Sequence, residues 1–361
     1  MFITDSSLCG PDAKCALKDA ANSKRLTTKS RLAARNYRRP RITKAITPAA
    51  IVKGFGDGIL GARSAENPVC NMTDRWVAAA LAAGILISQT QAAGAADKSL
   101  PRPDHVVVVI FENHSFHQII DPGRAPFIYS LAANSALFVN AFAVAHPSQP
   151  NYFALFSGST QGVRDNADHS FDAPNLAAAL ASANKSFIGY IESGSPRVHN
   201  PWESFNNAQR VERNLSELPN DFTQLPTVAF IIPNLNHDMH GAGWRSWHKN
   251  HLGAVIPSLN RYIDKRLVRA GDTWFKDRLS GYAQWANAHN SLLILTFDED
   301  DDNAGNHIPT FILGAHVRSD HYAERITHYN VFSTLLAMYH LPPFAAAVTN
   351  GPINSIWAVS P

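Results

Sequence analysis

The feature that most constrains the fold is an apolar run, Val106 to Phe111, that ends directly before Glu112 and Asn113. A strand without polar residues on either side must be buried on both faces. Sheets covered on both faces are typical of α/β proteins, in which helices alternate with parallel strands. The segment His105–Phe111 is therefore predicted to be a central strand of a largely parallel sheet.

The same alternation of apolar runs and helical patterns continues along the chain. Further strands are predicted at 187–191, 227–232, 291–297 and 310–313. Helices are predicted at 174–184, 254–268, 273–289 and 330–339, with Asp272 as the N-cap of the third. Together these segments predict a three-layer α/β/α sandwich with a largely parallel central sheet.

Charge and histidine content divide the chain near Met72. Residues 1–71 hold 13 Lys/Arg against 5 Asp/Glu and all three cysteines, whereas the rest holds 19 Lys/Arg against 24 Asp/Glu and all sixteen histidines. The basic excess of the chain therefore belongs to its first part and gives no nucleic-acid footprint on the body. We expect the chemistry to lie after Met72.

The segment 72–95 is predicted to be a secretory signal peptide. Arg75 supplies positive charge, 76–87 is a 12-residue apolar core, and Ala93 to Ala95 offer the small residues of a cleavage site. The apolar core is short for a membrane span, and the alternative is a buried helix. The expected organisation is a disordered or mis-called extension at 1–71, the signal peptide, and one catalytic domain at 96–361 in a secreted or periplasmic protein without stable membrane insertion.

Polar clusters follow three of the predicted strands directly. Glu112 and Asn113 follow the first, 234–240 follows the strand at 227–232, and Asp298 and Glu299 follow the strand at 291–297. Ligands bind at the carboxyl ends of strands in open α/β sheets. The candidate site is therefore expected at this edge of the sheet.

Four motifs in this order resemble the bacterial phosphoesterase family that contains acid phosphatases and phospholipases C, within the alkaline-phosphatase-like superfamily. They are Val109-Ile-Phe-Glu112-Asn113-His-Ser-Phe116, His146-Pro-Ser148-Gln-Pro150-Asn151-Tyr152, Pro233-Asn234-Leu-Asn-His237-Asp238-Met-His240 and Phe297-Asp298-Glu299-Asp300, with Asn306-His307-Ile-Pro309 downstream. The set spans about Pro103 to Pro343. The resemblance implies an alkaline-phosphatase-like fold and a hydrolase that acts on phosphoric ester bonds.

Ser148 is the candidate nucleophile. It stands at a predicted helix start, with Pro150 at an early helical position where a missing N–H costs little. Free backbone N–H groups and the helix dipole there favour an alkoxide and a phosphoryl oxygen. The alternative is that Ser148 is only an N-cap. By the resemblance, the Asn151 amide binds a phosphate oxygen.

A serine hydroxyl needs a base or a metal to become nucleophilic at neutral pH. Carboxylate and amide oxygens at two strand ends suit a divalent cation, which would also relieve the repulsion between converging carboxylates. The alternative is an acidic surface loop. The resemblance implies that one metal of unknown identity is held by Glu112, Asn113, Ser148, Asp298 and Glu299.

Two roles stay open for a second group of residues, which consists of His237, Asp238, His240 and His307. In the acid-phosphatase branch such residues bind phosphate oxygens and protonate the leaving group. In the two-zinc members of the superfamily, the counterparts of Asp238, His240 and His307 hold a second metal. The spacing Asp-x-His departs from the Asp-x-x-x-His of those enzymes.

The expected activity is hydrolysis of small-molecule phosphomonoesters through a phosphoserine intermediate, similar to that of an acid phosphatase. One alternative is a phospholipase C-type phosphodiesterase. An alternative of another class is a phosphate- or metal-binding protein without turnover, against which the retained Ser148 and its carboxylates argue.

We predict that residues 1–71 are dispensable. Expression from Met72 should give an exported, active protein whose mature amino terminus lies near Ala96, because the signal-peptide pattern begins there. Amino-terminal sequencing and a phosphatase assay on the exported protein check this. Loss of folding or activity on removal of 1–71 would contradict it.

Overall fold

The computed structural model describes residues 100–208, 210–241 and 257–358. The extension at 1–71 and the signal peptide at 72–95 lie outside these residues, so both stay predictions. None of the helices in the described ranges is both long and apolar enough to cross a membrane.

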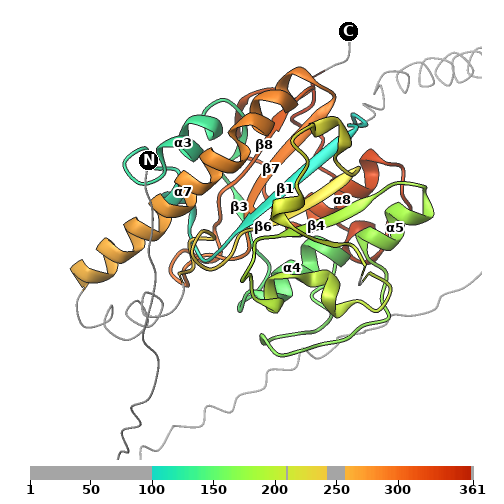
Figure 1. The fold of residues 1–361 in the computed structure, drawn as a ribbon, viewed down its shortest axis with the longest axis horizontal. Helices are drawn as coiled ribbons and strands as arrows, with labels where there is room; N and C mark the ends of the chain where they lie inside the picture. The colour runs from blue at the N-terminus through green and yellow to red at the C-terminus, as the bar shows by residue number, and fades with distance from the viewer. Residues whose placement is uncertain (1–99, 209, 242–256, 359–361) are drawn as a thin grey trace, which may run out of the picture. The chain divides into compact units, whose positions relative to one another are not determined.

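The described residues form an eight-stranded sheet in the order β5-β4-β6-β1-β7-β8-β2-β9 (Figure 1). Its strands are β1 (His105–Phe111), β2 (Ala136–Phe138), β4 (Phe187–Ile191), β5 (Glu212–Asn214), β6 (Val228–Ile232), β7 (Ser291–Phe297), β8 (Thr310–Gly314) and β9 (Asp320–Tyr322). A second, two-stranded sheet pairs β3 (Ala141–Phe142) with β10 (Ile326–Thr327).

Strand β1 lies in the middle of the sheet, as its apolar sequence predicts. It pairs in parallel with β6 on one side and β7 on the other, and Val107 is level with both Ala229 and Leu293. Its residues from Val106 to Phe111 are buried. Only β8 breaks the parallel pattern, because it runs antiparallel to both β7 and β2. The predicted largely parallel α/β fold is confirmed.

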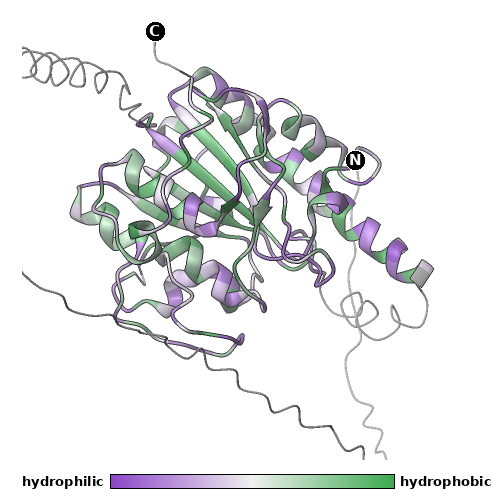
Figure 2. Cartoon of the chain, turned by 180° about the vertical axis from the view of Figure 1, so that it is seen from behind, coloured by the Kyte–Doolittle hydropathy of each residue, from purple (hydrophilic) through white to green (hydrophobic). Residues whose placement is uncertain are grey.

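Helices cover both faces of the sheet (Figure 1). They are α2 (Phe116–Ile119), α3 (Pro126–Ala132), α4 (Gln149–Ser157), α5 (Leu176–Ser182), α7 (Pro257–Ala288) and α8 (His328–Met338). Helix α7 packs against β7, β8 and α3, whereas α8 packs against α4, and α5 packs against β4. Figure 2 shows hydrophilic and hydrophobic bands alternating along α7, as expected for a helix with one face on the sheet.

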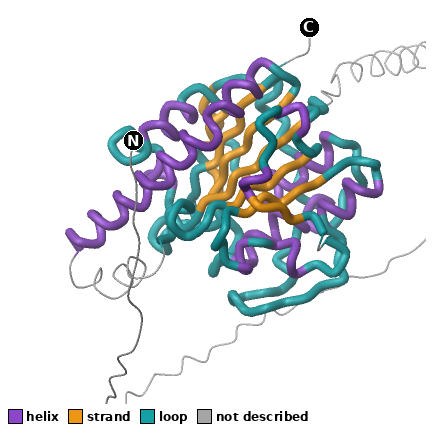
Figure 3. The backbone as a smooth tube through the Cα atoms, in the orientation of Figure 1, coloured by secondary structure: helices purple, strands orange, loops and turns teal. Residues whose placement is uncertain are grey.

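Irregular chain and short 3-10 turns connect β4 to β6, with β5 between them (Figure 3). These turns are η1 (Arg197–His199), η2 (Pro201–Ser204), η3 (Leu215–Glu217) and η4 (Phe222–Gln224), and η5 (Ala345–Val348) follows α8. They matter for the site because η1 carries His199 to it.

The predicted helix break at Asp272 is wrong, because α7 runs continuously from Pro257 to Ala288. The Asp272 carboxylate accepts hydrogen bonds from the backbone N–H groups of Ile128 (2.8 Å) and Phe127 (3.3 Å). It therefore caps the start of a neighbouring helix, α3, instead of the start of its own. The sequence signal for an N-cap was correct, but it belongs to a different helix.

Packing around β4 depends on a glycine. A Cβ atom on Gly189 would lie 2.2 Å from Cη2 of Trp202, a distance that real Cβ contacts do not show. The Trp202 ring is fully buried, and its Nε1 donates to Glu212 (2.7 Å), so the ring has little freedom to move away. Gly189 therefore leaves room for the largest side chain of this part of the core.

Gly189→Ala should destabilise the protein by about 1–3 kcal/mol, since an added methyl overpacks a core that cannot yield. Gly351→Ala is the matched control, because its added Cβ has no neighbour within 4 Å. The control should change the free energy of unfolding by less than about 0.5 kcal/mol. Denaturant unfolding curves measure both, and equal midpoints for the two variants would contradict the packing argument.

Candidate active site

The order of the strands brings three polar clusters to one edge of the sheet. Strands β6, β1 and β7 are neighbours, so the residues after their carboxyl ends meet. The backbone N–H of Glu112 donates to the carbonyl of Asp238 (2.9 Å), and that of Asp298 donates to Phe111 (2.9 Å). The predicted site edge is therefore present, and two of the clusters are tied directly to the end of β1.

Ser148 lies at the start of α4 and faces this edge. It has the helical conformation of a residue that continues into Gln149–Ser157, and its side chain forms no capping hydrogen bond. Its Oγ instead approaches Glu299 Oε1 (3.0 Å) and Glu112 Oε2 (3.3 Å). Asn166 takes the capping position, since its Oδ1 accepts from the Gln149 N–H (3.0 Å). The interpretation of Ser148 as a mere N-cap does not fit this geometry.

The five residues expected to hold a metal are linked to one another. Asn113 donates its backbone N–H to Asp298 Oδ1 (2.9 Å) and its side-chain Nδ2 to Glu112 Oε2 (3.3 Å). Ser148 joins Glu112 to Glu299, as described above. The structure thus brings Glu112, Asn113, Ser148, Asp298 and Glu299 together, while their roles as ligands stay predictions.

The electrostatics of this group fit a cation. Glu112, Asp298 and Glu299 are buried, and Asp298 Oδ2 is buried without a hydrogen-bond partner. In the described part of the chain, no Lys or Arg forms an ion pair with any of the three carboxylates. Buried carboxylates require a compensating cation or protons. Hard oxygen donors of this kind are what a divalent cation prefers.

Without a cation these carboxyls hold protons unusually strongly. Burial raises the pKa of Glu112 well above its usual range, and the nearby Asp298 and Asp238 carboxylates raise that pKa further. Burial and the Asp298 charge raise the pKa of Glu299 to about 9. Burial raises the pKa of Asp298 to about 6. A bound cation would replace these protons.

Tyr152 and His199 hold the second oxygen of Glu112. The Tyr152 hydroxyl donates to Glu112 Oε1, and His199 Nε2 lies 3.2 Å from the same oxygen. Burial lowers the pKa of His199 to about 3, so its ring is neutral at physiological pH. Its Nδ1 lies 3.6 Å from Asp238 Oδ2, and neither atom has a hydrogen-bond partner. Two unpartnered buried polar atoms thus face each other beside Glu112.

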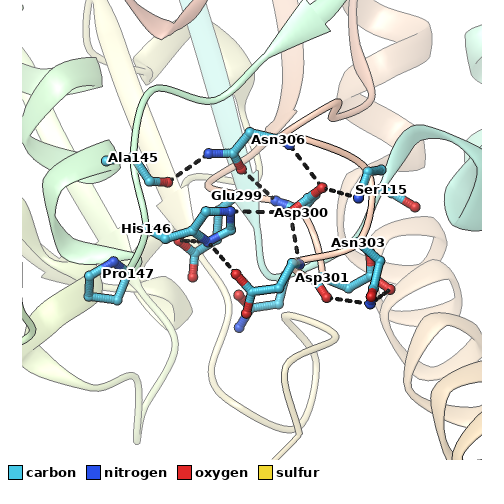
Figure 4. A network of polar contacts seen from close by, with 12 residues as sticks. Ser115, Ala145, His146, Pro147, Glu299, Asp300, Asp301, Asn303 and Asn306 are labelled. Atoms are coloured by element: carbon cyan, nitrogen blue, oxygen red, sulfur yellow. Dashed lines mark hydrogen bonds and ion pairs between the residues drawn. The ribbon is translucent and has the colours of Figure 1, made fainter. Parts of the chain in front are cut away.

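On the other side of Ser148, His146 lies among three carboxylates (Figure 4). Its Nδ1 is 2.9 Å from Glu299 Oε2 and 3.3 Å from Asp302 Oδ1, and its Nε2 is 3.2 Å from Asp300 Oδ1. Among the described residues, His146, Asp300 and Asp302 form a cluster in which one potential metal-ligand atom of each lies within 4.8 Å of the other two. Asp300 is already well bonded, however, because its oxygens also accept backbone N–H groups of Asp302 and Asn306.

The amide of Asn151 bonds mainly to the loop before Ser148. Its Oδ1 accepts from the backbone N–H groups of Val144 and Ala145 (both 3.0 Å), and its Nδ2 donates to the Ala145 carbonyl (2.9 Å). One longer contact, 3.5 Å, reaches Glu299. Asn151 thus holds the loop before Ser148 against α4, and its contact with a phosphate oxygen stays a prediction.

The side chain of His237 contacts Glu192 and Trp274. Its Nδ1 lies 2.9 Å from Glu192, and its ring stacks on Trp274 at 6.2 Å between centroids. The next residue, Asp238, does turn into the site, and the backbone N–H of His240 donates to Asp238 Oδ1 (2.8 Å). His237 and Asp238 are adjacent in the sequence, but their side chains lie in different surroundings. A sequence motif alone does not reveal this difference.

His307 is not grouped with Asp238 and His240. Its ring stacks on Phe116 (4.9 Å between centroids, 5° between planes), and its Nε2 donates to the carbonyl of Val139 (3.0 Å). A second metal held by Asp238, His240 and His307 therefore stays a prediction. Aromatic packing, which the motif does not encode, determines the position of His307.

Sequence reasoning assigned no role to Tyr152, His146 or His199. A signal for Tyr152 was present in the sequence. A helix that starts at Ser148 places residue 152 one turn further on the same face, and therefore near Ser148. His199 had no such signal, since it reaches the site from η1, far from every motif.

The fold and site define a phosphoesterase. The profile of the Phosphoesterase family matches residues 120–262 and 255–342, more than half of the chain, so the chain belongs to that family. Its relatives are phosphatases by name, and the protein is a hydrolase that acts on phosphate esters. The predicted family and enzyme class are confirmed.

Individual relatives cover the chain to different extents. A phosphatidylinositol-3-phosphatase of Mycobacterium tuberculosis is 40% identical over 297 residues, which is 77% of this chain and 91% of that protein. A phosphate-repressible acid phosphatase of Penicillium chrysogenum is 27% identical over 59% of this chain and 54% of its own length. The chain therefore spans about half the length of this fungal relative.

Among solved structures, a protein in the alkaline phosphatase superfamily from Vibrio parahaemolyticus is similar, with a TM-score of 0.49 and 13% identity. The alignment covers 70% of this chain and 69% of that chain.

The stability of the metal-free protein should fall as the pH rises. The folded-state pKa values of Glu299, about 9, and Asp298, about 6, exceed the ordinary values of 4.5 and 3.8 expected after unfolding. The folded protein therefore keeps protons that the unfolded chain has released, so this stability is complete below the ordinary values and is lost as the pH rises through the folded ones. A cation would replace those protons. The gap in melting temperature between cation-loaded and chelated protein should therefore widen from about pH 5 to about pH 9, which is the range between the ordinary and the folded-state pKa values.

Melting temperatures with and without chelator measure this gap. The difference cancels the contributions of titratable groups that lie far from these carboxylates, because those contributions are the same in both samples. Glu299→Gln is the control, since it removes the carboxyl with the pKa of about 9 and should flatten the profile of the chelated protein. A gap that stays constant or narrows with pH would count against a cation at this position.

Proposed function

We propose that the protein is an exported, metal-dependent phosphomonoesterase, similar to an acid phosphatase, that uses Ser148 as its nucleophile. The observation that carries the proposal is the position of Ser148 Oγ, 3.0 Å from Glu299 and 3.3 Å from Glu112, in a group of buried carboxylates without Lys or Arg partners among the described residues. A divalent cation held by Glu112, Asn113, Ser148, Asp298 and Glu299 would lower the pKa of the serine hydroxyl and neutralise charge on the phosphoryl group.

The covalent cycle follows from this arrangement. Ser148 Oγ attacks phosphorus, the Oγ–P bond forms, and the bond from phosphorus to the leaving-group oxygen breaks. The nearest acceptors for the hydroxyl proton are Glu299 and Glu112. Water then attacks phosphorus from the opposite side, the Oγ–P bond breaks, phosphate leaves and Ser148 regains its proton. Positioning and electrostatics dominate such reactions, which suits a buried, well-connected serine.

The side of the site that contains Asp238 supports contact with the substrate. The neutral His199 and the Asp238 carboxyl each have one buried polar atom without a hydrogen-bond partner there, and His240 is adjacent. Protonated Asp238 could donate to a phosphoryl or leaving-group oxygen, because burial raises the pKa of this carboxyl well above its usual range. We assign this region, without His237 and His307, to the phosphoryl group and its leaving group.

Phosphomonoesters are the preferred substrate class because the matched relatives are named as phosphatases. A lipid phosphomonoester is a second candidate, since the relative that is 40% identical is named a phosphatidylinositol-3-phosphatase. Assays with a soluble chromogenic phosphomonoester and with phosphatidylinositol 3-phosphate in mixed micelles separate these two. Release of inorganic phosphate, and not of a phosphorylated head group, distinguishes either from a phospholipase C-type diesterase.

Ser148→Ala should lower turnover of a phosphomonoester by at least about a thousandfold, because no other group would accept the phosphoryl group covalently. Acid quenching of the unmodified enzyme during turnover should trap phosphate on the peptide that contains Ser148. Ser157→Ala, at the other end of α4, should keep near-normal activity, since Ser157 Oγ bonds to the carbonyl of Phe153 and takes no part in the site.

Circular dichroism of both variants checks that the fold is retained. If Ser148→Ala turns over at a near-normal rate, or if phosphate is trapped on a different residue, the covalent mechanism is wrong. Loss of activity in chelator, restored by one divalent cation, tests the metal requirement independently of the nucleophile.

A further inference from the structure

A cavity of about 570 Å³ lies beside α7, outside the group of carboxylates around Ser148. Three arginines line it together with His237, Thr273 and Trp274, and these arginines are Arg266, Arg269 and Arg278. A volume of this size is within the range of small-molecule sites, which is roughly 300–1,000 Å³. The cavity is therefore large enough to take a ligand.

Carboxylates balance the arginines of this cavity only in part, since Asp272 lies within range of the charge of Arg269. In the described ranges, none of Arg266, Arg269 and Arg278 takes part in an ion pair, although Asp277 also lines the cavity. Arg266 donates to the Tyr262 hydroxyl (3.0 Å), and Arg269 makes a long contact (3.4 Å) with the Gly123 carbonyl. Three guanidinium groups against one carboxylate leave a net positive cavity on a chain whose residues 72–361 carry an excess of acids.

The wall of the cavity is a fixed aromatic surface. Trp274 is 6% exposed, and its Nε1 donates to Glu192 (3.1 Å). The His237 ring stacks on Trp274 with 19° between planes, and its Nδ1 also faces Glu192, at 2.9 Å. Glu192 thus holds both rings in place. A solvated helix face, which is the ordinary explanation for exposed arginines, does not need such a wall.

The cavity is connected to the Ser148 site through one loop. His237 lines the cavity, whereas the next residue, Asp238, is buried beside Glu112 and His199. The two binding regions are therefore separated by a single turn of chain after β6.

We propose that this cavity is a second phosphate-binding site, which takes a phosphate-ester anion in addition to the phosphoryl group at Ser148. Guanidinium groups bind phosphate oxygens through paired, charge-assisted hydrogen bonds, and a cluster of them on one helix suits a multiply charged anion. The anion is either a distal phosphate of a substrate or free inorganic phosphate. The first of these sources rests on the proposed phosphomonoesterase activity, and the second does not.

The first experiment measures binding without turnover. Inorganic phosphate is titrated calorimetrically into Ser148→Ala protein that also carries Arg266→Gln and Arg269→Gln. The matched control carries Lys265→Gln and Lys276→Gln, which remove the same charge from exposed positions of α7 that do not line the cavity. Loss of charged hydrogen bonds should weaken one phosphate-binding event by about ten- to a hundredfold in the arginine variant, and the control should bind like the parent. Identical isotherms for all three proteins would overturn the proposal.

The second experiment identifies the source of the anion. Values of KM are compared for p-nitrophenyl phosphate and for a series of alkanediol bisphosphates of increasing length, with the Ser148 side chain intact. A distal substrate phosphate is supported if the arginine variant raises the KM for the best bisphosphate about tenfold over the parent. Its KM for p-nitrophenyl phosphate, and both KM values of the lysine control, should then stay unchanged. Unchanged KM values together with weaker phosphate binding support free phosphate. If no ester is hydrolysed, the proposed function fails, whereas the calorimetric result still decides the cavity.

Discussion

The burial of like charges at the carboxyl edge of the sheet is the constraint on which the rest of the structure depends. Glu112, Asp298 and Glu299 are placed there by the ends of β1 and β7, and no Lys or Arg among the described residues forms an ion pair with them. Protons or a cation must compensate their charge. The carboxylates are costly to bury because they need these protons or this cation. The same positive charge can act on a phosphate ester, so the edge is suited to chemistry on such a substrate.

The surroundings of Ser148 differ between its two sides. Toward Asp238 the site contains the neutral His199 and buried polar atoms without a hydrogen-bond partner among the described residues. Toward Asp300 it contains His146 and a loop whose hydrogen bonds are largely satisfied. We infer that the first side receives the substrate, whereas the second supports the carboxylates that surround the nucleophile. Such support from outside the reacting groups is common in well-ordered active sites.

The strands and the nucleophile segment could be predicted from the sequence because their signals are local. An apolar run gives β1 without reference to any other element, and Pro150 after Ser148 gives the start of α4. Asp272 and His307 differ from their predicted roles for one shared reason, which is that the side-chain partner lies far away in the chain. Asp272 caps α3 at a sequence distance of 144 residues, and His307 bonds to a carbonyl 168 residues away. Residue type restricts what such side chains can bind, but the fold decides which partner is present.

Helix α4 has every residue from Gln149 to Ser157 buried, and Asn151 fastens the preceding loop to it. Ser148 therefore stands at the start of a fully buried helix and not on a lid or a loose turn. Close-packed interiors do not allow one segment to shift alone. On heating, the catalytic centre should consequently survive until the whole domain unfolds cooperatively, so that thermal inactivation and global unfolding would be one event rather than two.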